Sequence, residues 1–167
     1  VSYPLRLKKS DIKTKMFEYK APLTIYFILD ASASMIRSLQ QTIEVVKSLH
    51  AEGYKKKDKV AVITFYNKDM FVLQEPSVSL TRALEKMQNL EAQSYTPLAL
   101  ALDKVLRMIK VESIKAKDNI PVIIICSDMG ANISARYPDM EAKTVADFAI
   151  ITEELRVLSK KIGLKNI

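Results

Sequence analysis

The feature that most constrains this chain is an apolar run at residues 23–30 that ends abruptly in oxygen-bearing side chains. The run reads Leu-Thr-Ile-Tyr-Phe-Ile-Leu-Asp, which is typical of a central strand buried on both faces. Asp30, Ser32 and Ser34 then stand at alternate positions. Because alternate residues of an extended segment face the same way, the three side chains converge on one point. That point is a candidate seat for a hard cation.

A second apolar run ends in the same manner. Residues 120–126 read Ile-Pro-Val-Ile-Ile-Ile-Cys and lead into Ser127 and Asp128. In a doubly wound sheet, ligands bind beyond the carboxyl ends of the strands, where helices leave to opposite faces. If the two runs are neighbouring strands, Asp128 joins the first three side chains, and Thr96 at the start of a predicted helix closes the ring. Oxygen donors of this kind favour Mg²⁺, with Mn²⁺ or Ca²⁺ as alternatives.

The rest of the chain alternates between strand and helix patterns. Strands are predicted at residues 59–66 and 70–74, and amphipathic helices at 34–53, 79–90, 96–109 and 140–162, the last with Val145, Ala149, Leu155 and Leu158 facing inward. The short turn between the two strands makes them antiparallel neighbours. The pattern therefore predicts an α/β fold with a doubly wound, mostly parallel sheet, covered on both faces and carrying one antiparallel edge strand.

Length and composition predict one folded domain. The 167 residues are 49% hydrophobic and carry a formal charge of +7, which suits a single soluble domain. We expect residues 1–20 to form a basic extended leader and residues 21–167 to form the domain, truncated at its C-terminus just where another strand is due. No apolar stretch has the length of a membrane span, and the lone Cys126 favours a reducing, cytoplasmic setting.

The spacing of these oxygen-bearing residues resembles a known family. Residues 30–34 (Asp-Ala-Ser-Ala-Ser) are similar to the Asp-x-Ser-x-Ser motif of von Willebrand factor A (vWA) domains, and Thr96 and Asp128 stand where that family completes its metal-ion-dependent adhesion site (MIDAS). The resemblance is nearest to the D-type subunits of magnesium and cobalt chelatases, on three segments: residues 11–17, 96–99 and 127–132. Ala33, Ser94 and Tyr95 replace glycines that are usual in the family.

The resemblance implies a role for each site residue. Ser32 and Ser34 would bind the metal directly, Thr96 directly or through water, and Asp30 and Asp128 through water or from behind the direct ligands. Neutral hydroxyl ligands would leave the metal electron-poor, so a partner protein's Asp or Glu would fill its open position. Tyr66 and Tyr95 are candidates for the partner-binding rim, although packing is the commoner fate of such rings.

The resemblance also implies an assembly. A chelatase-like domain of this kind would couple to an AAA+ ATPase without catalysing a reaction itself, and the sequence contains no Gly-x-x-x-x-Gly-Lys-Ser/Thr loop. A metal-dependent hydrolase at the same site is an alternative, although no histidine or lysine is evident as a base near Asp30 or Asp128. Binding of nucleic acid through the basic clusters is a second alternative, weakened by the lack of interleaved aromatic residues.

Simpler interpretations apply to single residues. Ser34 and Thr96 are each also suited to capping a helix N-terminus. The lone histidine, His50, lies about 24 Å along the predicted helix from Ser34, at 1.5 Å per residue, and is expected to be structural. Cys126, inside an apolar strand, is expected to be a small core residue. Capping does not explain why the five oxygen donors fall at adjoining strand ends.

Overall fold

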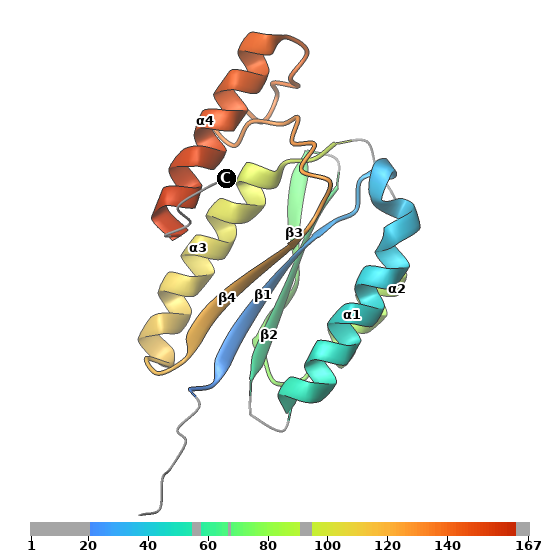
Figure 1. Ribbon diagram of the computed structural model, residues 1–167, viewed down its shortest axis with the longest axis vertical. Coiled ribbons are helices and arrows are strands. Elements are labelled where there is room, and N and C mark those ends of the chain that lie inside the picture. Colours follow the sequence, from blue (N-terminus) through green and yellow to red (C-terminus); the bar gives the residue numbers. More distant parts are fainter. Residues whose placement is uncertain (1–20, 55–57, 67, 91–94, 163–167) are drawn as a thin grey trace, which may run out of the picture.

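The computed structural model describes residues 21–54, 58–66, 68–90 and 95–162. Helices and strands alternate along these residues (Figure 1). In chain order they are β1 (Leu23–Asp30), the 3₁₀ helix η2 (Ala33–Met35), α1 (Ile36–Tyr54), β2 (Lys59–Tyr66), β3 (Asp69–Ser77), α2 (Thr81–Gln88), α3 (Leu98–Lys115), β4 (Ile120–Cys126) and α4 (Val145–Ile162). The predicted leader at residues 1–20 and residues 163–167, the end at which truncation is predicted, lie outside the described residues.

The four strands form one mixed sheet in the order β3-β2-β1-β4. Strand β1 pairs in parallel with both β2 and β4, and β3 pairs antiparallel with β2. The predicted fold class is therefore confirmed, including the antiparallel edge strand. Since Leu29 lies opposite Cys126 and Asp30 opposite Phe65, the carboxyl ends of β1, β2 and β4 reach the same edge of the sheet.

Helices cover both faces of the sheet. Figure 1 shows α1 and α2 on one face and α3 on the other, with α4 lying alongside α3. Tyr26 and Ile28 belong to the core on the α3 side, whereas Phe27 and Leu29 belong to the core on the α1 side. Alternate residues of β1 thus enter different cores, which explains why its sequence is apolar without interruption.

Helix α4 begins later than its sequence pattern suggests. Thr144 accepts a hydrogen bond from the Asp147 N–H at 3.2 Å, and the Asp147 carboxylate accepts one from the Thr144 N–H at 2.9 Å. This reciprocal capping box starts the helix at Val145, not at residue 140. The predictions that Val145 and Ala149 face inward are wrong, since Val145 is 88% exposed and Ala149 is also exposed. Because α4 lies against α3 at the side of the sheet, only a narrow stripe that includes Ile151 and Leu158 is buried.

Within the described residues, no helix is both long enough and apolar enough to cross a membrane.

Candidate metal site

The carboxylate of Asp30 is fixed at the end of β1. Asp30 is 1% exposed, and its Oδ1 accepts a hydrogen bond from the Ser32 N–H at 2.8 Å. Its Oδ2 accepts a hydrogen bond from the Ser127 hydroxyl, which comes from the end of β4. Both oxygens therefore hold neighbouring backbone and side chains in place. This arrangement suits a carboxylate that orients other groups better than one that binds a metal directly.

Ser32 and Ser34 bring their hydroxyl oxygens together beyond the strand. The two Oγ atoms are 3.0 Å apart, and the one-turn helix η2 between β1 and α1 sets their spacing. Two ligands at right angles around Mg²⁺, each at about 2.0–2.1 Å, lie about 3 Å from each other. The serine pair thus has the separation of two adjacent magnesium ligands.

Asp128 reaches this pair from the segment after β4. A hydrogen bond from the Ser34 hydroxyl and another from the Gly130 N–H, at 3.0 Å, hold the pKa of Asp128 below its usual value. These hydrogen bonds favour the ionised form of the carboxylate beside the serine hydroxyls. Met129, between Asp128 and Gly130, has a φ of 62°, a left-handed conformation that costs free energy in a non-glycine residue.

Thr96 is tied to the same segment through Asn132. The Thr96 N–H donates to Asn132 Oδ1 at 2.8 Å, and the Asn132 N–H donates to the Thr96 carbonyl at 3.3 Å. Thr96 is 4% exposed. The N-cap of α3 is Pro97, and no side chain makes a capping hydrogen bond there. Thr96 therefore does not cap α3.

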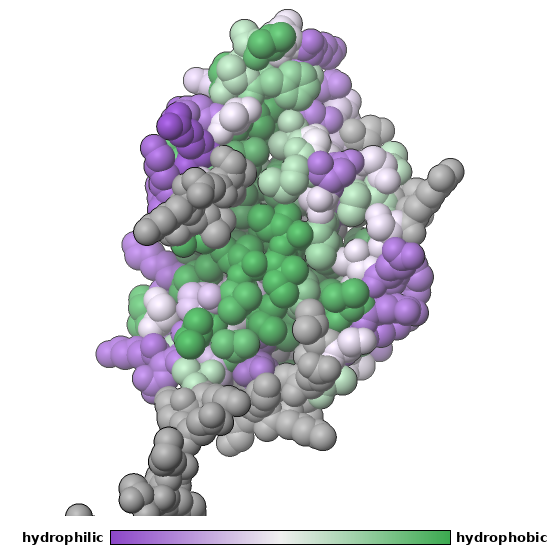
Figure 2. Space-filling view, viewed as in Figure 1, coloured by the Kyte–Doolittle hydropathy of each residue, from purple (hydrophilic) through white to green (hydrophobic). Residues whose placement is uncertain are grey.

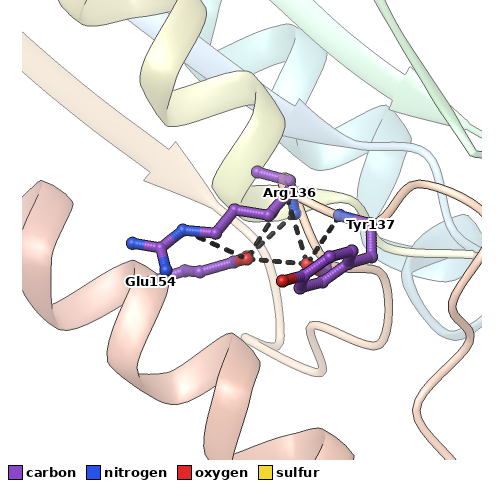
Figure 3. Close-up of polar contacts among 5 residues, drawn as sticks. Arg136, Tyr137 and Glu154 are labelled. Carbon is purple, nitrogen blue, oxygen red and sulfur yellow. Dashed lines mark hydrogen bonds and ion pairs between the residues drawn. The ribbon is translucent and has the colours of Figure 1, made fainter.

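The segment that follows Asn132 is anchored to α4 by a buried glutamate (Figure 3). Glu154 is 5% exposed and accepts hydrogen bonds from the Ser134 hydroxyl at 2.6 Å and the Ala135 N–H at 2.8 Å. A weaker bond of 3.3 Å comes from the Arg136 N–H, and the Arg136 guanidinium lies 4.0 Å away. Hydrogen bonds thus hold the loop at its start, at Asp128, and at its end, at Ser134 and Ala135.

The structure links four of the five predicted donors in one chain of hydrogen bonds, which runs from Asp30 to Ser32, from Ser32 to Ser34 and from Ser34 to Asp128. It holds Thr96 in the adjoining loop. Two positioning residues, Ser127 and Asn132, were not predicted as part of the site, although both stand in the segment that carries Asp128. Their partners lie 97 and 36 residues away along the chain, so local sequence patterns do not reveal these roles.

The donor chemistry of this cluster fits a hard cation. It combines two carboxylates with serine and threonine hydroxyls, and the described residues contain no group of three or more His, Cys, Asp or Glu side chains able to hold a metal. Oxygen ligands of this type suit Mg²⁺, Ca²⁺ or Mn²⁺ and not softer metals. The residues present are therefore compatible with the magnesium ion that the family resemblance implies.

Two tyrosines, Tyr66 and Tyr95, are expected at the rim of the site. Tyr66 ends β2 at the same edge of the sheet as Asp30, and its side chain lies outside the described part of the molecule. Tyr95 directly precedes Thr96 and is half-buried. The Lys68 ammonium lies 5.6 Å from the centre of its ring.

Comparison with known proteins places the chain in a known family. The pattern of the von Willebrand factor type A domain matches residues 25–131, more than half of the chain, and the chain belongs to this family. Within it, the sequence lies near the magnesium-chelatase subunits. It is 38% identical over 99 residues to the magnesium-chelatase 67 kDa subunit of Chlorobaculum tepidum, a match that covers 59% of this chain and 16% of that subunit.

A second chelatase relative matches more of the chain. The magnesium-chelatase 60 kDa subunit of Rhodobacter capsulatus is 29% identical over 131 residues, which is 78% of this chain and 23% of that subunit. The match to each relative thus takes in less than a quarter of its length.

Solved structures agree on the fold alone. The vWF domain of the type V pili tip protein Mfa5 from Porphyromonas gingivalis superposes with a TM-score of 0.60 at 18% identity, over 70% of this chain and 40% of that one. A von Willebrand factor type A structure from Catenulispora acidiphila gives a TM-score of 0.52 at 19% identity, over 80% of this chain and 30% of that one.

Proposed function

We propose that this chain is a metal-ion-dependent protein-binding module that serves as a non-catalytic coupling part of a chelatase-like assembly. The observation that carries the proposal is the pair of Ser32 and Ser34 hydroxyls, 3.0 Å apart, with carboxylates behind it. A site that uses a metal ion to hydrolyse a substrate would need a positioned base or a second metal. A site built from neutral oxygens is better suited to attracting a negatively charged group.

Each residue has a distinct task in this proposal. Ser32, Ser34 and Thr96 would hold Mg²⁺ through their hydroxyl oxygens. Asp30, fixed by the Ser32 N–H and the Ser127 hydroxyl, orients the serine turn. Asp128 accepts a hydrogen bond from the Ser34 hydroxyl, and this bond fixes the direction of the lone pairs on the serine oxygen. When bound, the ion supplies an open coordination position that attracts a carboxylate from another protein.

The similarity to subunits named for magnesium chelatase supports an assembly of that type. We propose that the partner is an AAA+ ATPase subunit that presents an Asp or Glu to the metal, and that the complex works in the cytoplasm. The role of this chain would be to transmit a conformational change between the ATPase and the rest of the assembly.

Metal binding is tested by thermal unfolding with and without millimolar MgCl₂. Because a ligand that binds only the folded state stabilises it by mass action, we expect the unfolding midpoint to rise for the wild type. Ser32→Ala should lose most of that gain. Ser113→Ala is the matched control, because Ser113 is exposed on α3 and its hydroxyl donates to the Lys110 carbonyl; this variant should keep the gain.

Partner binding is tested by capture from native lysate on the immobilised chain. The expected result is an ATPase subunit that is retained with Mg²⁺, released by a chelator and not captured by Ser32→Ala. Capture that ignores both the chelator and the substitution would contradict a metal-mediated contact.

A further inference from the structure

A cation and an aromatic ring from two different loops meet beside the candidate metal site. The Lys68 Nζ lies 5.6 Å from the centre of the Tyr95 ring, within the range of an attractive cation–π contact. Both side chains are half-buried. Lys68 belongs to the β2–β3 turn and Tyr95 to the loop before α3, so the contact joins segments that are separate in the sequence.

The pairing of strands puts this contact at the metal-site edge of the sheet. Asp30, the last residue of β1, lies opposite Phe65, the penultimate residue of β2. Lys68 lies two residues beyond the last residue of β2, and Tyr95 directly precedes Thr96 in the sequence. The two residues therefore flank the candidate site, one from the β2 side and one from the Thr96 side.

The contact fixes where the positive charge of Lys68 lies. A lysine side chain on an open surface samples many rotamers, whereas an ammonium held against a ring has a preferred position. Asp69, the next residue, is exposed, and these two described residues do not form an ion pair with each other. Asp69 therefore does not neutralise the charge of Lys68.

We propose that Lys68 and Tyr95 determine partner specificity by binding a second carboxylate of the partner, next to the one that the metal takes. The occupant is an acidic segment of a separate protein, in which a metal-binding Asp or Glu has at least one further acidic neighbour. Charge complementarity supports this choice, because a metal ion and the Lys68 ammonium are two positive charges at one rim. The proposal rests on the function proposed above.

The test uses two peptides of defined sequence and the full chain in MgCl₂. One peptide has three consecutive glutamates between glycines, and the other keeps the central glutamate but has glutamine at both outer positions. Nuclear magnetic resonance titration of the wild type should show the triacidic peptide binding about twofold to fivefold more tightly, as expected for one additional partly exposed charge contact.

Substitutions assign that preference to Lys68. Lys68→Met keeps the apolar stem and removes the charge, so the preference should fall to near unity while the Mg²⁺-induced rise in the unfolding midpoint is unchanged. Tyr95→Leu should weaken the preference in part, because the ammonium loses its fixed position. Lys110→Met is the matched control. Lys110 is exposed and lies in the half of α3 that is farther from the site, so this variant should retain the full preference.

An unchanged preference in Lys68→Met, or an equal loss in Lys110→Met, overturns the assignment to Lys68. Peptide binding by the wild type that does not depend on Mg²⁺ overturns the proposed function and this proposal with it. Metal-dependent binding with no preference between the peptides overturns the second-carboxylate proposal alone.

Discussion

Asn132 makes two hydrogen bonds to the backbone of Thr96. Its side-chain oxygen accepts the Thr96 N–H at 2.8 Å, and its own N–H donates to the Thr96 carbonyl at 3.3 Å. This pair of hydrogen bonds links the loop that carries Asp128 to the loop that carries Thr96. The alignment of donors from three loops therefore depends on a residue that would itself touch no metal.

Asn132→Ala should weaken both stability and metal binding. It removes the acceptor for the Thr96 N–H in a part-buried position, which costs about 1–3 kcal/mol, and it frees the Thr96 loop. We expect a lower unfolding midpoint in chemical denaturation and a smaller rise on adding Mg²⁺. Asn89→Ala is the control, because Asn89 bonds at an exposed site to the Glu85 carbonyl; a similar loss in both variants would argue against a special role for Asn132.

Met129→Gly should stabilise the chain. Met129 has a φ of 62°, and a non-glycine residue in this region costs about 1–2 kcal/mol, partly offset by the greater flexibility of glycine in the unfolded chain. The net gain should be up to about 1 kcal/mol in denaturant unfolding. Met129→Ala keeps the unfavourable φ while removing the 43% exposed side chain, so it should bring no gain. Equal stabilisation by both variants would assign the effect to the side chain.

The carboxyl group of Asp128 should titrate below its ordinary pKa of 3.8, because the Ser34 hydroxyl and the Gly130 N–H bond to the charged form. A pKa that is lower in the folded state adds stability above the ordinary pKa, and that stability is lost as the pH falls through the folded value. Carbon-13 magnetic resonance of the side-chain carboxyl measures this pKa directly. Ser34→Ala should raise the midpoint toward 3.8, and a midpoint that does not move would exclude Ser34 as the cause.

Glu154→Gln should destabilise the chain more strongly than the same substitution at the neighbouring Glu153. The buried carboxylate accepts from the Ser134 hydroxyl and the Ala135 N–H, so an amide in its place turns an N–H₂ group toward at least one donor. We expect a loss of about 2–4 kcal/mol in the free energy of unfolding. Glu153→Gln, at an exposed position paired with Arg156, should cost less than about 1 kcal/mol. Comparable losses would mean that Glu154 does not anchor the loop.

Local patterns predict the extent of strands β2 and β4 well. Both strands run over the residues that their apolar sequences indicate, 59–66 and 120–126, and both end where polar side chains begin. Strand β2 is buried within the sheet, as a continuous apolar sequence predicts, whereas β4 lies at the edge of the described sheet and is only partly buried. The motif at Asp30, Ser32 and Ser34 is equally local, since three residues in one turn fix their own spacing. The strand β3 is longer than predicted, Asp69–Ser77, because its pairing with β2 continues through an irregular register.

The amino-acid sequence by itself determined the class of fold, the two apolar strands that end in polar side chains, and the motif at Asp30, Ser32 and Ser34, because each rests on residues that are close together in the chain. The tertiary structure decided that the two strand ends adjoin, which brings the candidate donor Asp128 to this motif. Only the tertiary structure decided which residues hold those donors in place: Ser127 behind Asp30, Asn132 against Thr96, and Glu154 beneath the loop that follows. It also decided that Val145 is exposed, because the burial of a helix face depends on what packs against it. These outcomes depend on contacts between segments far apart in the sequence, and no local periodicity encodes them.

The same distinction applies to the exposed surface. Figure 2 shows a broad hydrophobic area on the face that carries β4 in Figure 1, where Pro121, Ile123 and Ile125 line an apolar groove with Leu106 and Ile109 of α3. The sequence determined that β4 is apolar. Its place at the edge of the described sheet was decided by strand order, because the pairing partners of a parallel strand are set by crossover connections and not by its own residues.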